Sequence, residues 1–181
     1  AKGIISYNRF EAATSTEEGA GHLSRAEKSF NKAIEQDPRN FLALEYLALI
    51  FERRNDYQMA VTWLVRAKHL SPKAHWGALN FHIGRIYMLM KNEVRAETYL
   101  QLSLQEGGHL AQTYYLLGYM RFENGRYLDS IEYFEEAKFY ALRKINRRSD
   151  PRLGENKINR IDENIDRSPD RLLLQTIYFY L

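Results

Sequence analysis

The chain has 181 residues, enough for a single domain with a sizeable core, and its 26 basic and 23 acidic side chains leave a net charge of only +3. Because the positive and negative charges nearly balance, the net charge does not require nucleic acid or an anionic membrane as a partner. The absence of cysteine excludes a disulfide framework, thiolate chemistry and cysteine-ligated zinc. No apolar run approaches the roughly 20 residues that span a bilayer. The chain begins at Ala1 and shows no signal peptide, which leaves the compartment open between the cytoplasm and, after processing, the periplasm or the exterior.

Helical periodicity runs through most of the chain and predicts an all-α protein. Apolar and small residues recur three and four positions apart, with polar turns or proline between the segments. Residues 1–6 are expected to be a short lead-in, and 18–21 a turn. Pro38 and Pro72 end the first two helix pairs, and the glycines at 107–108 end the third. The expected helices are 7–16, 22–36, 41–53, 57–70, 78–90, 93–105, 112–124 and 126–140, the last running on to about 145.

Small residues recur in pairs, which indicates that the helices form equivalent hairpins. Gly118 and Ser130 lie on either side of the turn at Gly125, twelve residues apart. Small side chains at such positions let two antiparallel helices approach closely. The second members of four such pairs are separated by 34, 36 and 34 residues, which is the period of a helical solenoid. The other pairs are Thr14 with Ala26, Ala48 with Ala60, and Gly84 with Ala96.

These repeats resemble the tetratricopeptide repeat family. The family pattern has W-x2-L-G-x2-Y in the first helix of each unit, followed by A-x3-F, A and P in the second. The first helix of unit one, around Phe10 and Thr14, departs from this pattern. The residues that match are Ala26, Phe30, Ala33 and Pro38 in unit one, Leu44, Leu47, Ala48, Phe51, Tyr57, Ala60, Ala67 and Pro72 in unit two, Ile83, Gly84 and Tyr87 in unit three, and Tyr114, Leu117, Gly118, Gly125 and Tyr127 in unit four.

The resemblance implies a right-handed α-solenoid of antiparallel helix pairs. The array is expected over residues 1–147, followed by a C-terminal extension at 148–181 that caps the array or takes part in assembly. The period slips by two residues near Trp76, which we interpret as a longer loop with the tryptophan in the seam between units. A tryptophan offered to a ligand is the alternative. The expected units are about 7–40, 41–74, 77–110 and 111–144.

In the resembled family the first helix of each unit lines a concave face along which ligands lie. One subclass binds acidic C-terminal peptides through lysine, asparagine and arginine, but the matching positions here hold Glu11, Ser15, Tyr46, Ala78 and His82. That clamp is therefore absent, and the groove is expected to take an apolar or amphipathic peptide with aromatic anchors. The predicted groove residues are Tyr46, Leu49, Phe81, His82, Arg85, Tyr115, Tyr119 and Phe122.

The C-terminal extension carries two further helix signals. Isoleucines three and four apart at 155–167 predict a narrow amphipathic helix. Residues 168–170 then form a start signal for a helix that continues into the most apolar stretch of the chain, from Leu172 to Leu181. This stretch is expected to cover the last unit, to fill a groove of its own or of a second copy, or to continue elsewhere. Self-association through residues 172–181 is the alternative function.

No catalytic or cofactor-binding motif accompanies the repeats. A Gly-rich phosphate loop, a His-Glu-x-x-His sequence and a nucleophile elbow are all missing from the sequence. His75 and His82 share a helical face but stand too far apart to hold one metal unaided. The basic run at 143–148 is favoured at a helix C-terminus by the dipole, so it does not by itself predict nucleic acid. We therefore predict a scaffold or adaptor that binds another protein, with no enzyme activity, no cofactor and no metal site.

Overall fold

The computed structural model describes residues 2–11, 16–149 and 169–180, and every regular element in these ranges is a helix. The prediction of an all-α chain is confirmed. The elements are α1 (Lys2–Glu11), α2 (Thr16–Gln36), α3 (Phe41–Arg53), α4 (Tyr57–Leu70), the short 3-10 helix η1 (Lys73–His75), α5 (Trp76–Leu89), α6 (Glu93–Gln105), α7 (Leu110–Glu123), α8 (Tyr127–Ser149) and α9 (Pro169–Tyr180).

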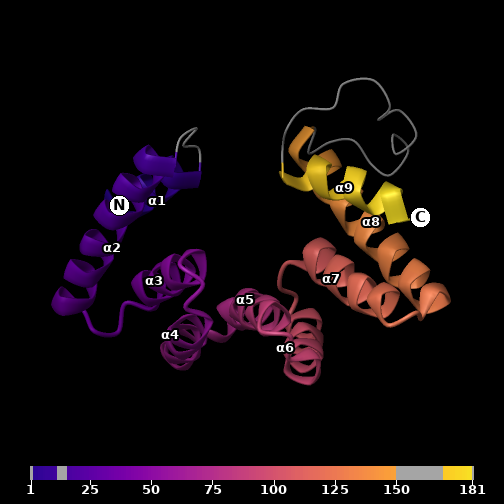
Figure 1. Ribbon diagram of the computed structural model, residues 1–181, viewed down its shortest axis with the longest axis horizontal. Coiled ribbons are helices and arrows are strands. Elements are labelled where there is room, and N and C mark those ends of the chain that lie inside the picture. The colour runs from indigo at the N-terminus through magenta and orange to yellow at the C-terminus, as the bar shows by residue number, and fades with distance from the viewer. Residues whose placement is uncertain (1, 12–15, 150–168, 181) are drawn as a thin grey trace.

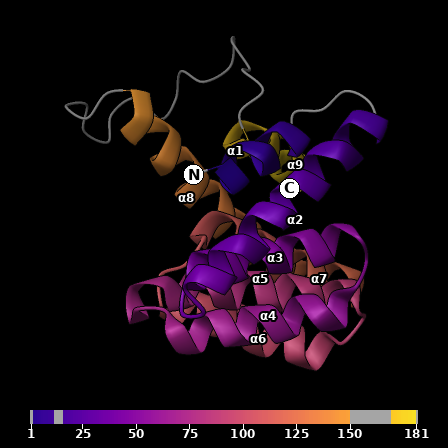
Figure 2. The same ribbon diagram turned by 90° about the vertical axis from the view of Figure 1, so that its left-hand side faces the viewer.

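Consecutive helices pack as pairs, and the pairs follow one another along a curve (Figure 1). The pairs are α1 with α2, α3 with α4, α5 with α6, and α7 with α8, while α9 packs on α8. In Figure 1 the molecule is U-shaped, with α3, α5 and α7 along the inner side and α4 and α6 along the outer side. Figure 2 shows α4 and α6 again below α3 and α5, with α1 and α9 above them. The predicted solenoid is therefore present.

The turns inside the helix pairs share one design. Asn55, Lys91 and Gly125 each adopt a positive φ, of 61°, 58° and 72°, two residues after the first helix of a pair ends. At the first two turns the next residue, Asp56 or Asn92, caps the second helix. Its side-chain oxygen accepts a hydrogen bond of 3.2 Å from the backbone N–H three residues further on. The repeat in sequence is thus also a repeat in local backbone structure.

The small residues of the repeat are the points at which paired helices touch. A Cβ atom added to Gly84 would lie 2.8 Å from the Leu100 side chain, and one added to Gly118 would lie 2.9 Å from the Phe134 ring. Such distances leave no room for a side chain. Leu100 and Phe134 each lie four residues after the small residue of the second helix. Their side chains therefore fill the space that the glycine of the first helix leaves open.

The first pair differs from the prediction. The helix expected at 7–16 is wrong, because α1 begins at Lys2 and ends at Glu11. The turn expected at 18–21 is also wrong, because α2 begins at Thr16 and runs through it. Glycine in a helix interior costs about 1 kcal/mol, which is why the sequence favours a turn there. The structure instead places Gly3 at the close approach, where a Cβ atom would lie 2.8 Å from the Phe30 ring.

Trp76 lies in the seam between the second and third pairs. It is the first residue of α5, directly after η1, and its side chain is half-buried. The indole N–H donates to the Ser71 carbonyl at 3.4 Å. The ammonium groups of Lys68 and Lys73 lie 5.1 Å and 5.8 Å from the ring centroid. These contacts agree with the interpretation of the two extra residues as a longer connection with the tryptophan packed against it.

The connection between α6 and α7 runs against the first turn of α5. A Cβ atom on Gly108 would lie 2.0 Å from the carbonyl carbon of Gly77, so neither residue has space for a side chain. The buried Ser103 hydroxyl holds the two segments together, since it lies 2.9 Å from the Gly77 carbonyl and 3.0 Å from the Gly108 carbonyl. The glycine pair is thus a packing requirement as well as the end of a helix.

Helix α9 begins at Pro169, as the start signal predicts, and packs onto the last pair. Ile177 is fully buried beside Phe134 and Ala137. Three other predictions concern residues outside the described ranges and have no structural outcome. They are the small residue Thr14, the groove position Ser15 and the amphipathic helix at 155–167.

Candidate functional site

Helices α3, α5 and α7 each present one stripe of accessible side chains. Their other sides pack against their own partner helices and against the neighbouring pairs. The accessible stripes therefore face the inner side of the curve. The spacing of four, three and four residues within each stripe is that of a single helical face. We call these residues the groove stripes: Leu42, Tyr46, Leu49 and Arg53 on α3; Ala78, His82, Arg85 and Leu89 on α5; and Gln112, Leu116, Tyr119 and Glu123 on α7.

Two carboxylates on α3 join the second unit to the third. The Glu52 side chain is only 8% exposed, and its Oε2 accepts from Arg85 Nη2 at 2.8 Å. Seven residues, or about two helical turns, earlier, Glu45 Oε1 lies 3.7 Å from His82 Nε2. Both carboxylates stand on the flank of the α3 stripe that faces α5. They position the polar part of the α5 stripe instead of pointing into the groove.

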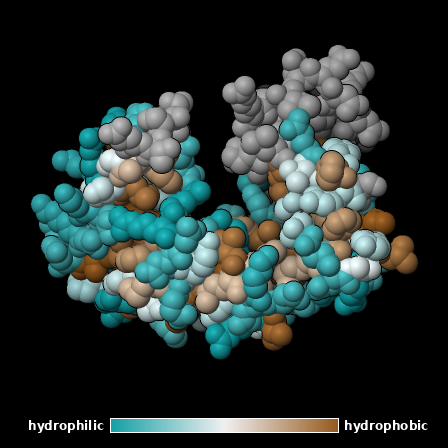
Figure 3. Space-filling view, viewed as in Figure 1, coloured by the Kyte–Doolittle hydropathy of each residue, from teal (hydrophilic) through white to brown (hydrophobic). Residues whose placement is uncertain are grey.

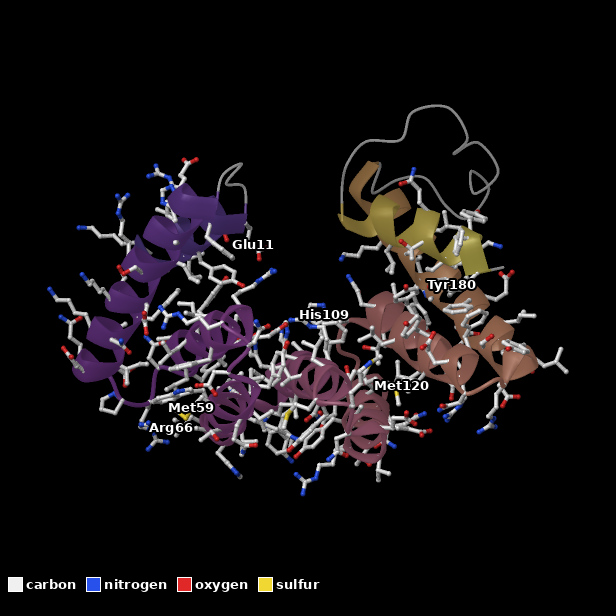
Figure 4. The ribbon with its side chains drawn as sticks, viewed as in Figure 1. Glu11, Met59, Arg66, His109, Met120 and Tyr180 are labelled. Carbon is white, nitrogen blue, oxygen red and sulfur yellow. The ribbon has the colours of Figure 1, made fainter. Side chains whose placement is uncertain are left out.

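Phe81 lies on the corresponding flank of α5 and is closed off by His109. Its side chain is only 7% exposed. The ring centroids of Phe81 and His109 are 4.8 Å apart, and His109 also lies 5.5 Å from His82. Figure 4 shows His109 on the inner side of the curve, between the two arms. Phe81 therefore packs between units, and His109 is the residue that lies over it at the surface.

Burial sets the protonation of this central region. It raises the pKa values of the Glu45 and Glu52 carboxyls, and the Arg85 guanidinium opposes the shift at Glu52. Burial, together with Arg85, lowers the pKa of His82 to about 3. His82 is thus neutral at pH 7. Its contact with Glu45 is that of a neutral imidazole beside a carboxyl group, not an ion pair.

Two polar atoms of the α5 stripe have no hydrogen-bond partner among the residues that the structure describes. They are His82 Nδ1 and Arg85 Nε, and both are buried. Leaving a buried donor or acceptor unpaired costs about 1–3 kcal/mol. Arg85 Nε carries a hydrogen and needs an acceptor, whereas His82 Nδ1 donates or accepts according to its tautomer. Because both atoms are buried, a ligand on the groove stripes would reach them only if the side chains around them moved.

The N-terminal end of the groove stripes is covered by α1. The Tyr46 ring stacks on Phe30 at 5.1 Å, with an interplanar angle of 8°, and meets Tyr7 of α1 edge-on at 5.5 Å. Arg53, at the end of the same stripe, forms an ion pair with Glu11 of α1. Tyr46 is thus mainly part of the packing between the first two units.

The C-terminal end of the groove stripes is covered by α9. The Tyr180 ring centroid lies 5.1 Å from Phe122, 5.3 Å from Phe134, 6.1 Å from Tyr119 and 6.5 Å from Tyr115. Figure 4 shows Tyr180 on the arm formed by α8 and α9. Three predicted anchors therefore contact a side chain of this same chain.

The structure divides the predicted groove residues into two sets. Tyr46, Leu49, His82, Arg85 and Tyr119 lie on the groove stripes. The remaining three, Phe81, Tyr115 and Phe122, lie on the flank that faces the next helix pair or α9.

The exposed leucines Leu42 and Leu89 also lie on the stripes. Their spacing of four residues from Tyr46 and Arg85 is the signal that identifies them. His109 has no such signal, because it follows a glycine pair outside any helix.

Two further observations limit the chemistry of the surface. Among the residues that the structure describes, no three histidine, aspartate or glutamate side chains are grouped so that they could hold a metal ion. The described helices also include none that is long and apolar enough to cross a membrane.

Comparisons with known proteins agree with this architecture. Tetratricopeptide repeat models match residues 15–75 and residues 111–138. No curated protein sequence matches the chain. A solved MamA structure is 15% identical, with a TM-score of 0.56 over 99% of this chain and 87% of that one. The structure of PilF from Pseudomonas aeruginosa is 14% identical, with a TM-score of 0.59 over 88% and 68%. Identities this low show a shared fold and nothing more.

Proposed function

We propose, from the premise that this chain is a tetratricopeptide repeat protein, that it is an adaptor that holds a peptide segment of another protein along its groove stripes. Tetratricopeptide repeats serve in general as protein-interaction scaffolds, and the family is generally non-catalytic. The proposal for this chain is narrower, because it assigns the contact to the inner sides of α3, α5 and α7.

One observation carries the proposal. The chain's own terminal helices cover both ends of the groove stripes, with Tyr7 at one end and Tyr180 at the other. No described helix covers the central part in this way. It exposes Leu89 to 46%, and the Arg85 side chain one turn earlier on α5 is 33% exposed. An accessible apolar side chain beside a partly exposed guanidinium is the kind of surface that a partner completes.

The side chains at the centre favour an amphipathic peptide. Leu42, Leu49 and Leu89 offer apolar contact on α3 and α5. Between them, the 33% exposed Arg85 side chain offers guanidinium donors, beside the neutral imidazole of His82. A segment that places apolar side chains on the leucines and a backbone or side-chain amide against the polar pair would satisfy both kinds of group. The neutral His82 gives no attraction for a strongly acidic ligand.

A selection experiment tests this assignment. Peptides would be selected from a displayed random library on the immobilised protein, and the dissociation constant of the best binder measured by fluorescence anisotropy. Leu89→Glu places a charge on the inner stripe and should weaken binding about 30-fold, or about 2 kcal/mol. Val94→Glu is the matched control, since Val94 is 79% exposed on α6, in the outer row of helices, in the same unit.

The comparison between the two variants decides the matter. Equal affinity of both variants for the selected peptide would contradict the proposal. So would a larger loss for Val94→Glu, which would move the binding surface to the outer side. Circular dichroism of each variant checks that the helices remain intact.

Self-association is a second candidate function. Tyr178 and Phe179, within the apolar C-terminal stretch, are 57% and 83% exposed. Light scattering of the parent protein and a Phe179→Ser variant tests it. A mass that falls from dimer to monomer with this substitution would support self-association.

A further inference from the structure

Helix α9 is held more lightly than the inner helices. Ile177 is buried among the α9 side chains that the structure describes. The reason is position: α5 packs between neighbours on both sides, while α9 packs against α8 and α7 on one side only. Elements with few buried contacts open at the lowest free-energy cost. The space that α9 fills can therefore exchange its occupant at a lower cost than the space that an inner helix such as α5 fills.

The surface beneath α9 recognises a definite side-chain pattern, and we call this surface the α9 seat. Leu173 packs against Ala141 and Leu142, and Ile177 packs against Phe134. Tyr180 fills the end of the seat.

The seat is lined by aromatic rings where Tyr180 enters it. Phe122 and Phe134 lie within 5.3 Å of the Tyr180 ring, and Tyr119 lies at 6.1 Å. The occupant thus contributes residues at positions i, i+4 and i+7, which is one face of a helix. On the flank, Lys138 Nζ stands 5.3 Å from the Tyr178 ring, so an aromatic residue at i+5 is also favoured.

We infer that the α9 seat is a helix-binding site that α9 occupies in competition with a partner protein. The fitting partner is an amphipathic helix with Leu, Ile and an aromatic residue in the spacing of Leu173, Ile177 and Tyr180. The inference rests on the proposed adaptor function and adds to it a site, a ligand class and a competing segment.

Tethering explains why the partner is a foreign helix and not a second copy. Helix α9 is joined to α8 in the same chain, so it binds its seat intramolecularly, at an effective concentration above that of a free helix in dilute solution. A second copy of this chain carries the same helix and would present it at micromolar concentration, so it competes poorly. A foreign ligand overcomes the tether by binding the seat more tightly, or by binding the groove stripes at the same time.

A labelled peptide with the sequence of residues 169–181 is the probe. Its affinity for the full chain is measured by fluorescence anisotropy for the parent protein, Tyr180→Ala and Phe179→Ala. Tyr180→Ala weakens α9 but leaves the seat intact, so we expect it to bind the peptide at least tenfold more tightly than the parent does. Phe179→Ala is the matched control: it changes the neighbouring, 83% exposed aromatic residue and should bind like the parent.

A second substitution locates the binding. The double variant Phe122→Ala/Tyr180→Ala should bind the peptide at least tenfold more weakly than Tyr180→Ala alone, because Phe122 lines the seat. Leu89→Glu, on the groove stripes, should leave the affinity for this peptide unchanged. Phe122→Ala tests binding at the α9 seat and Leu89→Glu tests binding at the groove stripes, so a failure of one proposal can be told from a failure of the other.

Other results would overturn the inference. If the Tyr180→Ala variant keeps its helicity and binds the peptide no better than the parent does, α9 is a fixed part of the array. If Tyr180→Ala loses helicity, Leu173→Ala serves in its place with the same expectation. A parent that is a dimer by light scattering, and a monomer after Tyr180→Ala, would identify a second copy as the occupant.

Discussion

At the scale of single residues, Gly108 is the described glycine with the least space for a side chain. Its Cα lies against the Gly77 backbone, where a Cβ atom would come within 2.0 Å of the Gly77 carbonyl carbon. Backbone atoms cannot move aside as a side-chain tip can. Gly108→Ala should therefore lower the free energy of unfolding by at least about 3 kcal/mol. Urea denaturation measures the change.

Gly21→Ala is the control for that substitution. Gly21 lies inside α2, and a Cβ atom there would meet nothing within 4 Å. Alanine in an open helix position should stabilise the protein by roughly 0.5–1 kcal/mol. Equal effects of the two substitutions would contradict the close packing of the α6–α7 connection against the first turn of α5.

His82 makes a pH-dependent prediction at the same scale. Its pKa is lowered from 6.5 to about 3, so the folded state stays neutral while the unfolded state takes up a proton below pH 6.5. Stability linked to His82 is therefore complete above pH 6.5 and is lost as the pH falls. The loss is up to about 1.4 kcal/mol per pH unit. The raised pKa values of Glu45 and Glu52 act in the opposite direction.

Comparison with a variant isolates the contribution of His82. Urea denaturation of His82→Gln at pH 7 and pH 5 should show a drop smaller than that of the parent by up to about 2 kcal/mol. His69→Gln, at an exposed position on α4, is the matched control and should follow the parent. A parallel pH dependence of parent and His82→Gln would show that His82 is not shielded in the folded protein.

Single residues also show how far the sequence predicts the site. Arg85 and Tyr119 were identifiable because the repeat period fixes which helical face each occupies. Phe81 was not separable from them, because its burial depends on His109 at the start of the next unit. His109 adopts a left-handed backbone conformation with φ of 41°, which follows from packing and not from a local motif. The helical face on which each residue lies could be predicted from the sequence, but the residue of the next unit that covers it could not.

At the scale of elements, Phe134 links the last helix pair to α9. It is fully buried on α8, fills the space beside Gly118 and contacts Tyr180. Phe134→Ala should cost about 3–5 kcal/mol of unfolding free energy, because it leaves a cavity between three helices. Leu128→Ala, 81% exposed on the same helix, should change stability by less than about 0.5 kcal/mol. Similar urea midpoints for the two variants would contradict this packing.

Helix boundaries were predictable where the repeat supplied a turn residue and a cap. Asp56 and Asn92 follow residues with positive φ and begin α4 and α6 as expected. The first pair lacks this signal, and its glycines at 19 and 21 suggested a turn where α2 is continuous. Packing of Gly3 against Phe30 decides the position of α1. A contact between residues so far apart in the chain leaves no trace in local periodicity.

At the scale of the whole molecule, the curve separates an inner and an outer surface. Figure 3 shows hydrophobic side chains among the charged ones near the middle of the U and at its right-hand edge, beside α8. Figure 4 places Met59 and Arg66 on the outer side, away from the opening between the arms. The terminal helices cover the ends of the inner surface through Tyr7 and Tyr180. We propose the central inner surface as the one that a partner contacts.

The central claim is that a peptide ligand lies on that inner surface. Amide chemical-shift mapping by NMR, with a peptide selected on the immobilised protein, tests it most directly. The account predicts the largest shifts in α3 and α5, around Leu49 and Arg85, with small shifts in the outer helices α4 and α6. Shifts that are largest around Met59 or Val94, with α3 and α5 unaffected, would contradict it.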